Sequence, residues 1–298
     1  MNKLESLVFP FSHKEFLAPY LTGESYVTHD LKESISELYN IDFLTSLDGL
    51  LEKWPHEVNV HLPDLSDEAS SIDVKTNEAL SYYNKKMSLL FNDVDRISPI
   101  LQTWTKQLRK DLGLSALTYG RNLVYATPEG GGTAAHFDQN INFVLQLHGT
   151  KDWWVAKNTD VKNPLTRHTM GTEPDPELAS YLEGPLSEKF PDDCEHYTLK
   201  PGSLLFIPRG SWHKTNSQTD SLALNFTFSP PSYLDLLTTA MRGRLAGEER
   251  WRATADFVAD PERCLEALGN FDDLLQELSL EIPHWKASHI LSATEIEE

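Results

Sequence analysis

Residues 133–155 read TAAHFDQNINFVLQLHGTKDWWV, a stretch of short β-branched and aromatic runs separated by polar or glycine-containing turns. Such alternation is typical of antiparallel strands. The strands expected in and around this stretch are 121–126, 134–137, 141–147, 151–156, 196–199, 203–207 and 222–228. Many short strands at close spacing predict a β-sandwich or barrel.

Helical periodicity flanks this β-rich region on both sides. The helices expected from apolar spacing and capping residues are 31–39, 43–54, 76–90, 97–112, 233–245, 248–257, 262–268 and 271–280. We therefore predict an α+β protein with a mainly β core in three regions. These are an N-terminal helical region (1–115) packing on the barrel, the barrel itself (116–230) and a C-terminal helical region (231–298).

Two irregular segments interrupt the periodic pattern. Residues 63–73 (PDLSDEASSID) are acidic, small and polar, and are expected to form an exposed loop. Residues 158–197 insert five prolines between two expected strands. Because long irregular loops inside a compact domain are usually functional, we expect the second segment to help cover a site.

The chain is strongly acidic, which restricts its partners. It has 298 residues, with 26 Lys and Arg against 45 Asp and Glu, for a net charge of −19. A nucleic-acid binder gains affinity by neutralising phosphates with cationic side chains, so direct nucleic-acid binding is not expected. The charge favours a basic partner, or it serves solubility alone.

Cysteine content and hydropathy bear on the compartment. The two cysteines, Cys194 and Cys264, are too few for a disulfide framework or a thiolate zinc site. The N-terminus has no apolar stretch of signal-peptide length, and no apolar run approaches the roughly 20 residues that span a bilayer. A cytoplasmic protein that does not contact membranes is predicted.

A metal-binding pattern lies at the end of the strand expected at 134–137. His136 and Asp138 are two residues apart, so their side chains point to the same face of an extended chain. His213, in the segment FIPRGSWHKTN, could add a second imidazole from another strand. Two His and one carboxylate on one face of a metal form the facial triad of non-haem Fe(II) oxygenases.

Three segments together resemble a known family. They are residues 133–155, LKPGSLLFIPRGSWHKTNS (199–217) and LALNFTF (222–228). From about Leu114 to Phe228 the chain is similar to the JmjC-type 2-oxoglutarate oxygenases, which are built on a cupin-like double-stranded β-helix, or jelly roll. Within that family it most resembles the bacterial ribosomal oxygenases and the asparaginyl hydroxylase of hypoxia-inducible factor.

The resemblance implies a site for iron and a site for the cosubstrate. His136, Asp138 and His213 would be the metal ligands and catalytic residues. Lys151 stands where the asparaginyl hydroxylase has Lys and the ribosomal enzymes have Arg, so it would pair with the far carboxylate of 2-oxoglutarate. Thr133 would help to hold that carboxylate.

Amides would complete the cosubstrate site on the same resemblance. Asn142 and Asn225 match amides near the metal-binding end of 2-oxoglutarate. Without the resemblance, the residues around Lys151 favour a surface lysine on a hairpin. Thr133 and the two asparagines could instead satisfy turn backbone.

Other chemically capable side chains are expected to be structural. His148 is predicted to be a turn residue, and Trp153, Trp154 and Trp212 are predicted to be core or rim aromatics. The spacing of His168, Cys194 and His196 indicates no second metal site.

The resemblance implies a dioxygenase that uses Fe(II), 2-oxoglutarate and O₂ to hydroxylate an amino-acid side chain in a protein or peptide. A basic ribosomal protein would suit the charge of the chain. We also expect a homodimer formed through the C-terminal helices. The alternatives are a hydroxylase of a small molecule or peptide natural product, a metal-dependent cupin enzyme that does not use 2-oxoglutarate, and a non-catalytic binding module.

Overall fold

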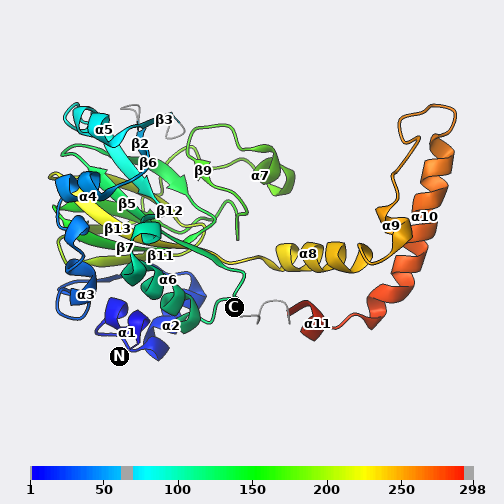
Figure 1. The fold of residues 1–298 in the computed structure, drawn as a ribbon, viewed down its shortest axis with the longest axis horizontal. Coiled ribbons are helices and arrows are strands. Elements are labelled where there is room, and N and C mark those ends of the chain that lie inside the picture. The colour runs from blue at the N-terminus through cyan, green and yellow to red at the C-terminus, as the bar shows by residue number, and fades with distance from the viewer. Residues whose placement is uncertain (1, 62–69, 292–298) are drawn as a thin grey trace. The chain divides into compact units, whose positions relative to one another are not determined.

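Two antiparallel β-sheets pack face to face, and residues 133–155 contribute strands to both (Figure 1). The computed structural model describes residues 2–61 and 70–291. It divides the chain into two units. The first contains residues up to 114 together with 119–229, and the second contains 115–118 and the residues from 230 onward.

The larger sheet has eight described strands. In spatial order they are β1 (Tyr26–Thr28), β11 (Leu204–Ile207), β7 (Ile141–His148), β13 (Ser221–Ser229), β5 (Tyr119–Thr127), β4 (Ser88–Asn92), β2 (Val58–His61) and β3 (Ser71–Val74). The smaller sheet runs β10 (Glu195–Leu199), β8 (Lys151–Ala156), β12 (Trp212–Ser217), β6 (Gly132–Phe137) and β9 (His168–Thr169).

Strands consecutive in the chain alternate between these sheets. β5 and β7 lie in the larger sheet and β6 and β8 in the smaller one, and the same alternation is repeated by β10 to β13. Alternation of this kind winds the chain into a double-stranded β-helix, so the predicted fold class is confirmed.

Apolar side chains hold the two sheets and the N-terminal helices together. Phe16 packs on Phe143 and Phe206 of the larger sheet, with ring centroids 5.8 and 5.1 Å apart. Trp104 of α6, almost fully buried, lies 6.3 Å from Phe226 of β13. The helices of this layer are α1 (Lys3–Val8), α2 (His13–Thr22), α3 (Ser36–Tyr39), η1 (Asp42–Leu44), α4 (Leu47–Lys53), α5 (Thr76–Tyr83), η2 (Val94–Ile97) and α6 (Pro99–Asp111).

The expectation that residues 1–115 are mainly helical is wrong in part. This region contributes β1, β2, β3 and β4, which extend the larger sheet at both edges. The helix expected at 76–90 ends at Tyr83, and Lys86 then takes a positive φ of 67° before β4 begins. Leu89 and Phe91 of β4 are fully buried, and β4 pairs with β5. Burial and strand pairing therefore decide the local structure here against the helical pattern.

The loop expected at 63–73 is wrong for residues 71–73, which lie in a strand. Residues 62–69 lie outside the described residues. Ser71–Val74 forms β3, which pairs in antiparallel register with β2.

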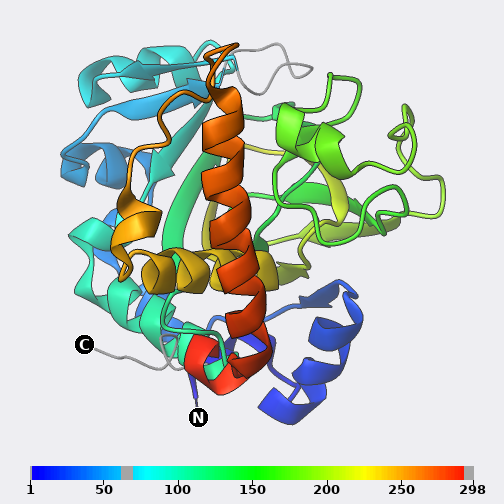
Figure 2. The same cartoon turned by 90° about the vertical axis from the view of Figure 1, so that its right-hand side faces the viewer.

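The second unit is helical, as expected for residues 231–298. Its helices are α8 (Tyr233–Leu245), α9 (Glu249–Arg252), α10 (Cys264–Glu281), η3 (Ile282–His284) and α11 (Ala287–Leu291). The two helices expected at 262–268 and 271–280 form the single helix α10, seen along its length in Figure 2. One interior glycine, Gly269, costs a helix only about 1 kcal/mol, which is too little to force a break in the helix.

No described helix is both long enough and apolar enough to cross a membrane.

Candidate functional site

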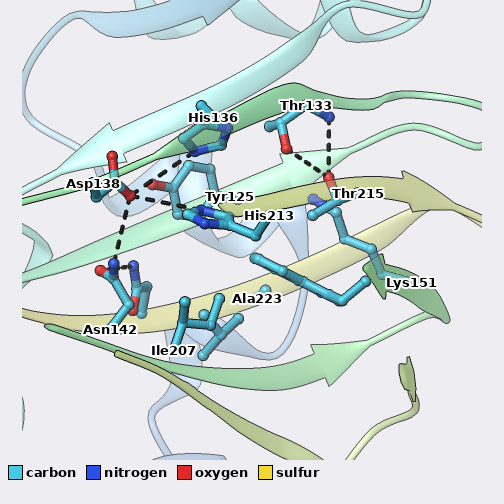
Figure 3. A pocket seen from close by; sticks show the side chains of 13 residues that line it. Tyr125, Thr133, His136, Asp138, Asn142, Lys151, Ile207, His213, Thr215 and Ala223 are labelled. Atoms are coloured by element: carbon cyan, nitrogen blue, oxygen red, sulfur yellow. Dashed lines mark hydrogen bonds and ion pairs between the residues drawn. The ribbon is translucent and has the colours of Figure 1, made fainter. Parts of the chain in front are cut away.

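Strand pairing in the smaller sheet brings the two expected imidazoles together. β12 and β6 are antiparallel neighbours, and His213 lies directly opposite His136 in their register. The ring centroids are 4.1 Å apart. Asp138 follows β6 at once, and its Oδ2 lies 3.9 Å from Nε2 of His136 and 3.7 Å from Nε2 of His213 (Figure 3). One donor atom from each of the three residues lies within 4.8 Å of the others.

Backbone contacts orient both imidazoles toward Asp138. Nδ1 of His136 lies 2.8 Å from the carbonyl oxygen of Ala134, and Nδ1 of His213 lies 2.9 Å from that of Ser211. A carbonyl oxygen only accepts, so each Nδ1 carries a proton, which leaves Nε2 as the atom of each ring that faces Asp138. Burial, with a smaller contribution from His136, holds the pKa of His213 well below its ordinary value, which favours the neutral ligand form.

The donor set fits a divalent metal such as Fe(II). Two imidazole nitrogens and one carboxylate oxygen, all from one side, would leave the opposite side of a bound metal open to other ligands. Among the described residues, this is the one group of three or more His, Cys, Asp or Glu placed to hold a metal ion.

A cavity between the two sheets contains this group and all seven residues expected at the site. Its lining residues are Tyr125, Thr133, His136, Asp138, Asn142, Val144, Lys151, Trp153, Ile207, His213, Thr215, Ala223 and Asn225. The smaller sheet supplies the imidazoles, Lys151 and Thr133, and the larger sheet supplies the asparagines. A cosubstrate lying in this cavity could therefore contact both sheets.

Lys151 is buried rather than exposed on a hairpin. It is 3 % exposed, and its Nζ donates a hydrogen bond to Oγ1 of Thr127, 3.1 Å away. The turn before it requires Gly149, which has a φ of +70° and where an added Cβ would lie 2.0 Å from a backbone oxygen of Asp220. Burial lowers the pKa of Lys151 to about 8. A buried cation with no described carboxylate partner suits a negatively charged ligand.

Thr133 pairs with a threonine across the strand. Oγ1 of Thr133 lies 3.0 Å from Oγ1 of Thr215, which also accepts a hydrogen bond from the backbone N–H of Thr133. Both hydroxyls line the cavity that contains Lys151, so they can donate to a carboxylate placed there.

The two asparagines form a hydrogen-bonded chain that ends at Asp138. Oδ1 of Asn142 accepts from Nδ2 of Asn225 at 3.0 Å and from Oγ1 of Thr227 at 2.9 Å. Nδ2 of Asn142 then lies 3.5 Å from Oδ2 of Asp138 (Figure 3). Asn142 and Asn225 therefore lie at the end of the cavity that contains Asp138.

Six residues that line the cavity were not expected at the site, and three of them carry a polar group: Tyr125, Trp153 and Thr215. Strand alternation could have found two of them, because Trp153 follows Lys151 by two positions and Thr215 follows His213 by two. Trp153 had been expected in the core or at the rim. Its ring lies 6.0 Å from that of His213 in a stacked arrangement.

The remaining candidate side chains lie outside the cavity lining. His148 ends β7 with its Nε2 3.2 Å from the carbonyl oxygen of Leu44, and His196 stacks on Trp154. Trp212, as expected for a core aromatic, packs in a separate apolar cluster with Phe137, and Cys194 packs against that cluster.

The chain is similar to a known domain and to a bacterial protein. The profile of the JmjC domain matches residues 101–236. The Bacillus subtilis protein YxbC is 35% identical over 259 residues, which cover 85% of this chain and 78% of YxbC.

More distant relatives are named for oxygenase activities. Ribosomal oxygenase 1 of Rattus norvegicus is 30% identical over 51% of this chain and 23% of its own length. The bifunctional lysine-specific demethylase and histidyl-hydroxylase NO66 of Drosophila persimilis is 33% identical over 41% of this chain and 16% of its own length. The chain thus spans less than a quarter of either relative.

A solved structure shares the fold. The ribosomal oxygenase YcfD of Escherichia coli, in complex with cobalt and 2-oxoglutarate, aligns with a TM-score of 0.54 at 17% identity. The alignment covers 90% of this chain and 67% of YcfD.

Proposed function

The chain belongs to the JmjC-domain family of 2-oxoglutarate-dependent oxygenases, and we propose that it hydroxylates an amino-acid side chain in a protein or peptide. His136, Asp138 and His213 would hold Fe(II), and Lys151 would pair with 2-oxoglutarate. The observation that carries this proposal is the convergence of the three donor atoms in the same cavity as a buried lysine.

Each residue has a defined task in this reaction. When bound, Fe(II) would supply the coordination sites for 2-oxoglutarate and O₂, which react with a C–H bond of the substrate to yield succinate, CO₂ and a C–OH group. Lys151, Thr133 and Thr215 would bind the far carboxylate. The Asn142–Asn225 pair would restrain Asp138 and the near end of the cosubstrate. The two sheets that enclose the cavity would limit the access of bulk water to the reaction.

The other function classes are less well supported by these contacts. A cupin enzyme without 2-oxoglutarate has no need of a buried cation at Lys151, whose charge is costly to bury alone. A binding module has no need of two imidazoles whose Nε2 atoms both face one carboxylate. A small-molecule hydroxylase would use the same contacts, so only the substrate distinguishes it.

A basic polypeptide, such as a ribosomal protein, is the substrate that we propose. A net charge of −19 attracts a cationic partner and speeds the encounter at low salt. Two of the relatives are named for ribosomal or histidyl substrates. We place the reaction in the cytoplasm, in keeping with the low cysteine content.

Mass spectrometry tests the substrate class. The chain is incubated with Fe(II), 2-oxoglutarate and total or ribosomal protein from its own organism. We expect a mass shift of +16 Da on a peptide, absent when His136→Ala replaces the wild-type chain. Succinate formation stimulated by a small-molecule extract, without any shift in the protein fractions, would instead support a small-molecule substrate.

We further propose that the helical unit forms a homodimer interface with a second copy of the chain. No residue of α8 is buried, and Tyr233 is 89% exposed. Leu265, Leu268, Phe271 and Leu275 follow one side of α10 at helical spacing and are all exposed. An apolar stripe of this kind is costly to leave in water, and a second copy would cover it.

Light scattering at micromolar concentration tests the dimer. We expect twice the 33.8 kDa mass of one chain, and a shift toward the monomer when Leu265 and Leu268 are both replaced by Glu. Leu21→Glu in α2 is the matched control, since Leu21 is 77% exposed in the other unit. A wild-type mass near 34 kDa would contradict the proposal.

A further inference from the structure

The two oxygens of the Asp138 carboxylate face different partners. Oδ2 is the atom that lies 3.7 and 3.9 Å from the two imidazole nitrogens. Oδ1 lies 3.4 Å from Nε of Arg167, within ion-pair distance. Arg167 belongs to the proline-rich segment 158–197, so this segment reaches the candidate metal ligand directly.

The fold holds Arg167 in this position from both sides. Strand β9 pairs with β6 so that Thr169 lies opposite His136, and Nη1 of Arg167 donates to Oγ1 of Thr169 at 2.8 Å. On the N-terminal side of Arg167, the carbonyl oxygen of Pro164 accepts a hydrogen bond from the guanidinium of Arg209 at 2.7 Å. This contact holds the residues that precede Arg167. The Arg167 side chain is 36% exposed, and burial lowers its pKa to about 10, so it remains a cation near neutral pH.

We propose that Arg167 is a positioning residue that holds Oδ1 of Asp138 and thereby presents Oδ2 alone to the metal. The inference rests on the proposed metal site. A carboxylate can bind a metal through one oxygen or through both, and binding through both would occupy a position that the cosubstrate or O₂ needs. A charge-assisted contact to one oxygen favours the single-oxygen arrangement.

Orientation and charge predict opposite effects when Arg167 is removed. A guanidinium near a divalent cation repels it, so a purely electrostatic role predicts tighter metal binding in Arg167→Met. An orienting role predicts weaker binding, because outer-shell partners of metal ligands are typically worth 10- to 100-fold in affinity.

Titration of the metal-free chain with Co(II) separates these cases without measuring turnover. We expect Arg167→Met to weaken Co(II) binding by about tenfold or more and to change the visible absorption of bound Co(II), which reports coordination number. Arg167→Lys should recover part of the Co(II) affinity and part of the wild-type spectrum, because an ammonium keeps the charge but not the planar, forked donors of a guanidinium. Arg209→Gln, which loosens the same segment through Asn163 and Pro164, should change the affinity much less.

Three results would overturn the inference while leaving the metal site in place. They are Arg167→Met binding Co(II) within twofold of wild type with an unchanged spectrum, tighter binding in that variant, and an equal loss in Arg209→Gln. Failure of the wild-type chain to bind Co(II) at all would refute the metal site itself, and this inference with it.

Discussion

Replacing His136, Asp138 or His213 by Ala is expected to reduce 2-oxoglutarate turnover to background and to remove stoichiometric metal binding. Each residue supplies one of three donor atoms that lie within 4.8 Å of one another, and two donors do not hold a divalent ion in fixed geometry. The loss should exceed the roughly 10- to 100-fold that removal of an outer-shell partner costs. Succinate formation and metal content of the purified protein are the measurements.

His148→Ala is the matched control for these variants. It also removes an imidazole from the same chain segment, but His148 contacts the backbone of Leu44 and does not line the cavity. Circular dichroism should show intact folding in all four proteins. Near wild-type turnover in any of the three ligand variants would remove that residue from the site.

Lys151→Met is expected to raise the 2-oxoglutarate concentration needed for half-maximal turnover by roughly 10²- to 10⁴-fold, because leaving one member of a buried ion pair alone costs about 3 to 5 kcal/mol. Lys151→Arg should be milder, since it keeps the charge on a larger and differently directed group. Lys214→Met is the control, because Lys214 projects from β12 over the rings of Trp154 and Phe190. A 2-oxoglutarate titration unchanged in Lys151→Met would place the lysine outside the cosubstrate site.

The pH dependence gives an independent test of Lys151. Its pKa in the free protein is lowered to about 8, so wild-type affinity for 2-oxoglutarate should fall as the pH rises through 8, and the Met variant should lose this dependence. The same shift affects stability. Lys151 holds its proton more tightly in the unfolded chain than in the folded one, so burying the charged lysine lowers the free energy of unfolding. This destabilisation is fully present below about pH 8 and is relieved as the pH rises toward 10.5. Without cosubstrate, Lys151→Met should therefore melt at or above the wild-type temperature near pH 7.

Local pattern predicted the barrel strands closely, and the residues that it singled out lie together. The strand expected at 151–156 is observed with the same bounds, and that at 141–147 is one residue longer. All seven expected site residues line one cavity. The strands that carry these residues are short, rich in β-branched and aromatic side chains, and bounded by turns. The spacing of the motifs constrains which of these strands must be neighbours.

The N-terminal region was harder to predict because its sequence suits both helix and strand. Residues 88–92 carry apolar side chains that continue the helical stripe of 76–83, and only the free edge of β5 makes them a strand. Long-range pairing of this kind leaves no mark within a local window. Segment 158–197 was expected to help cover a site, but its prolines indicate only irregular structure and say nothing of which side chain reaches the site.

The amino-acid sequence by itself determined the fold class, the candidate metal ligands and the candidate lysine, because spacing of two along a strand and a family-specific set of motifs are local properties. Tertiary structure alone decided three further features. It placed His213 opposite His136, buried Lys151 beside Thr127, and brought Arg167 to Oδ1 of Asp138. Each depends on register and packing between segments far apart in the chain, and such contacts form only when the whole core closes.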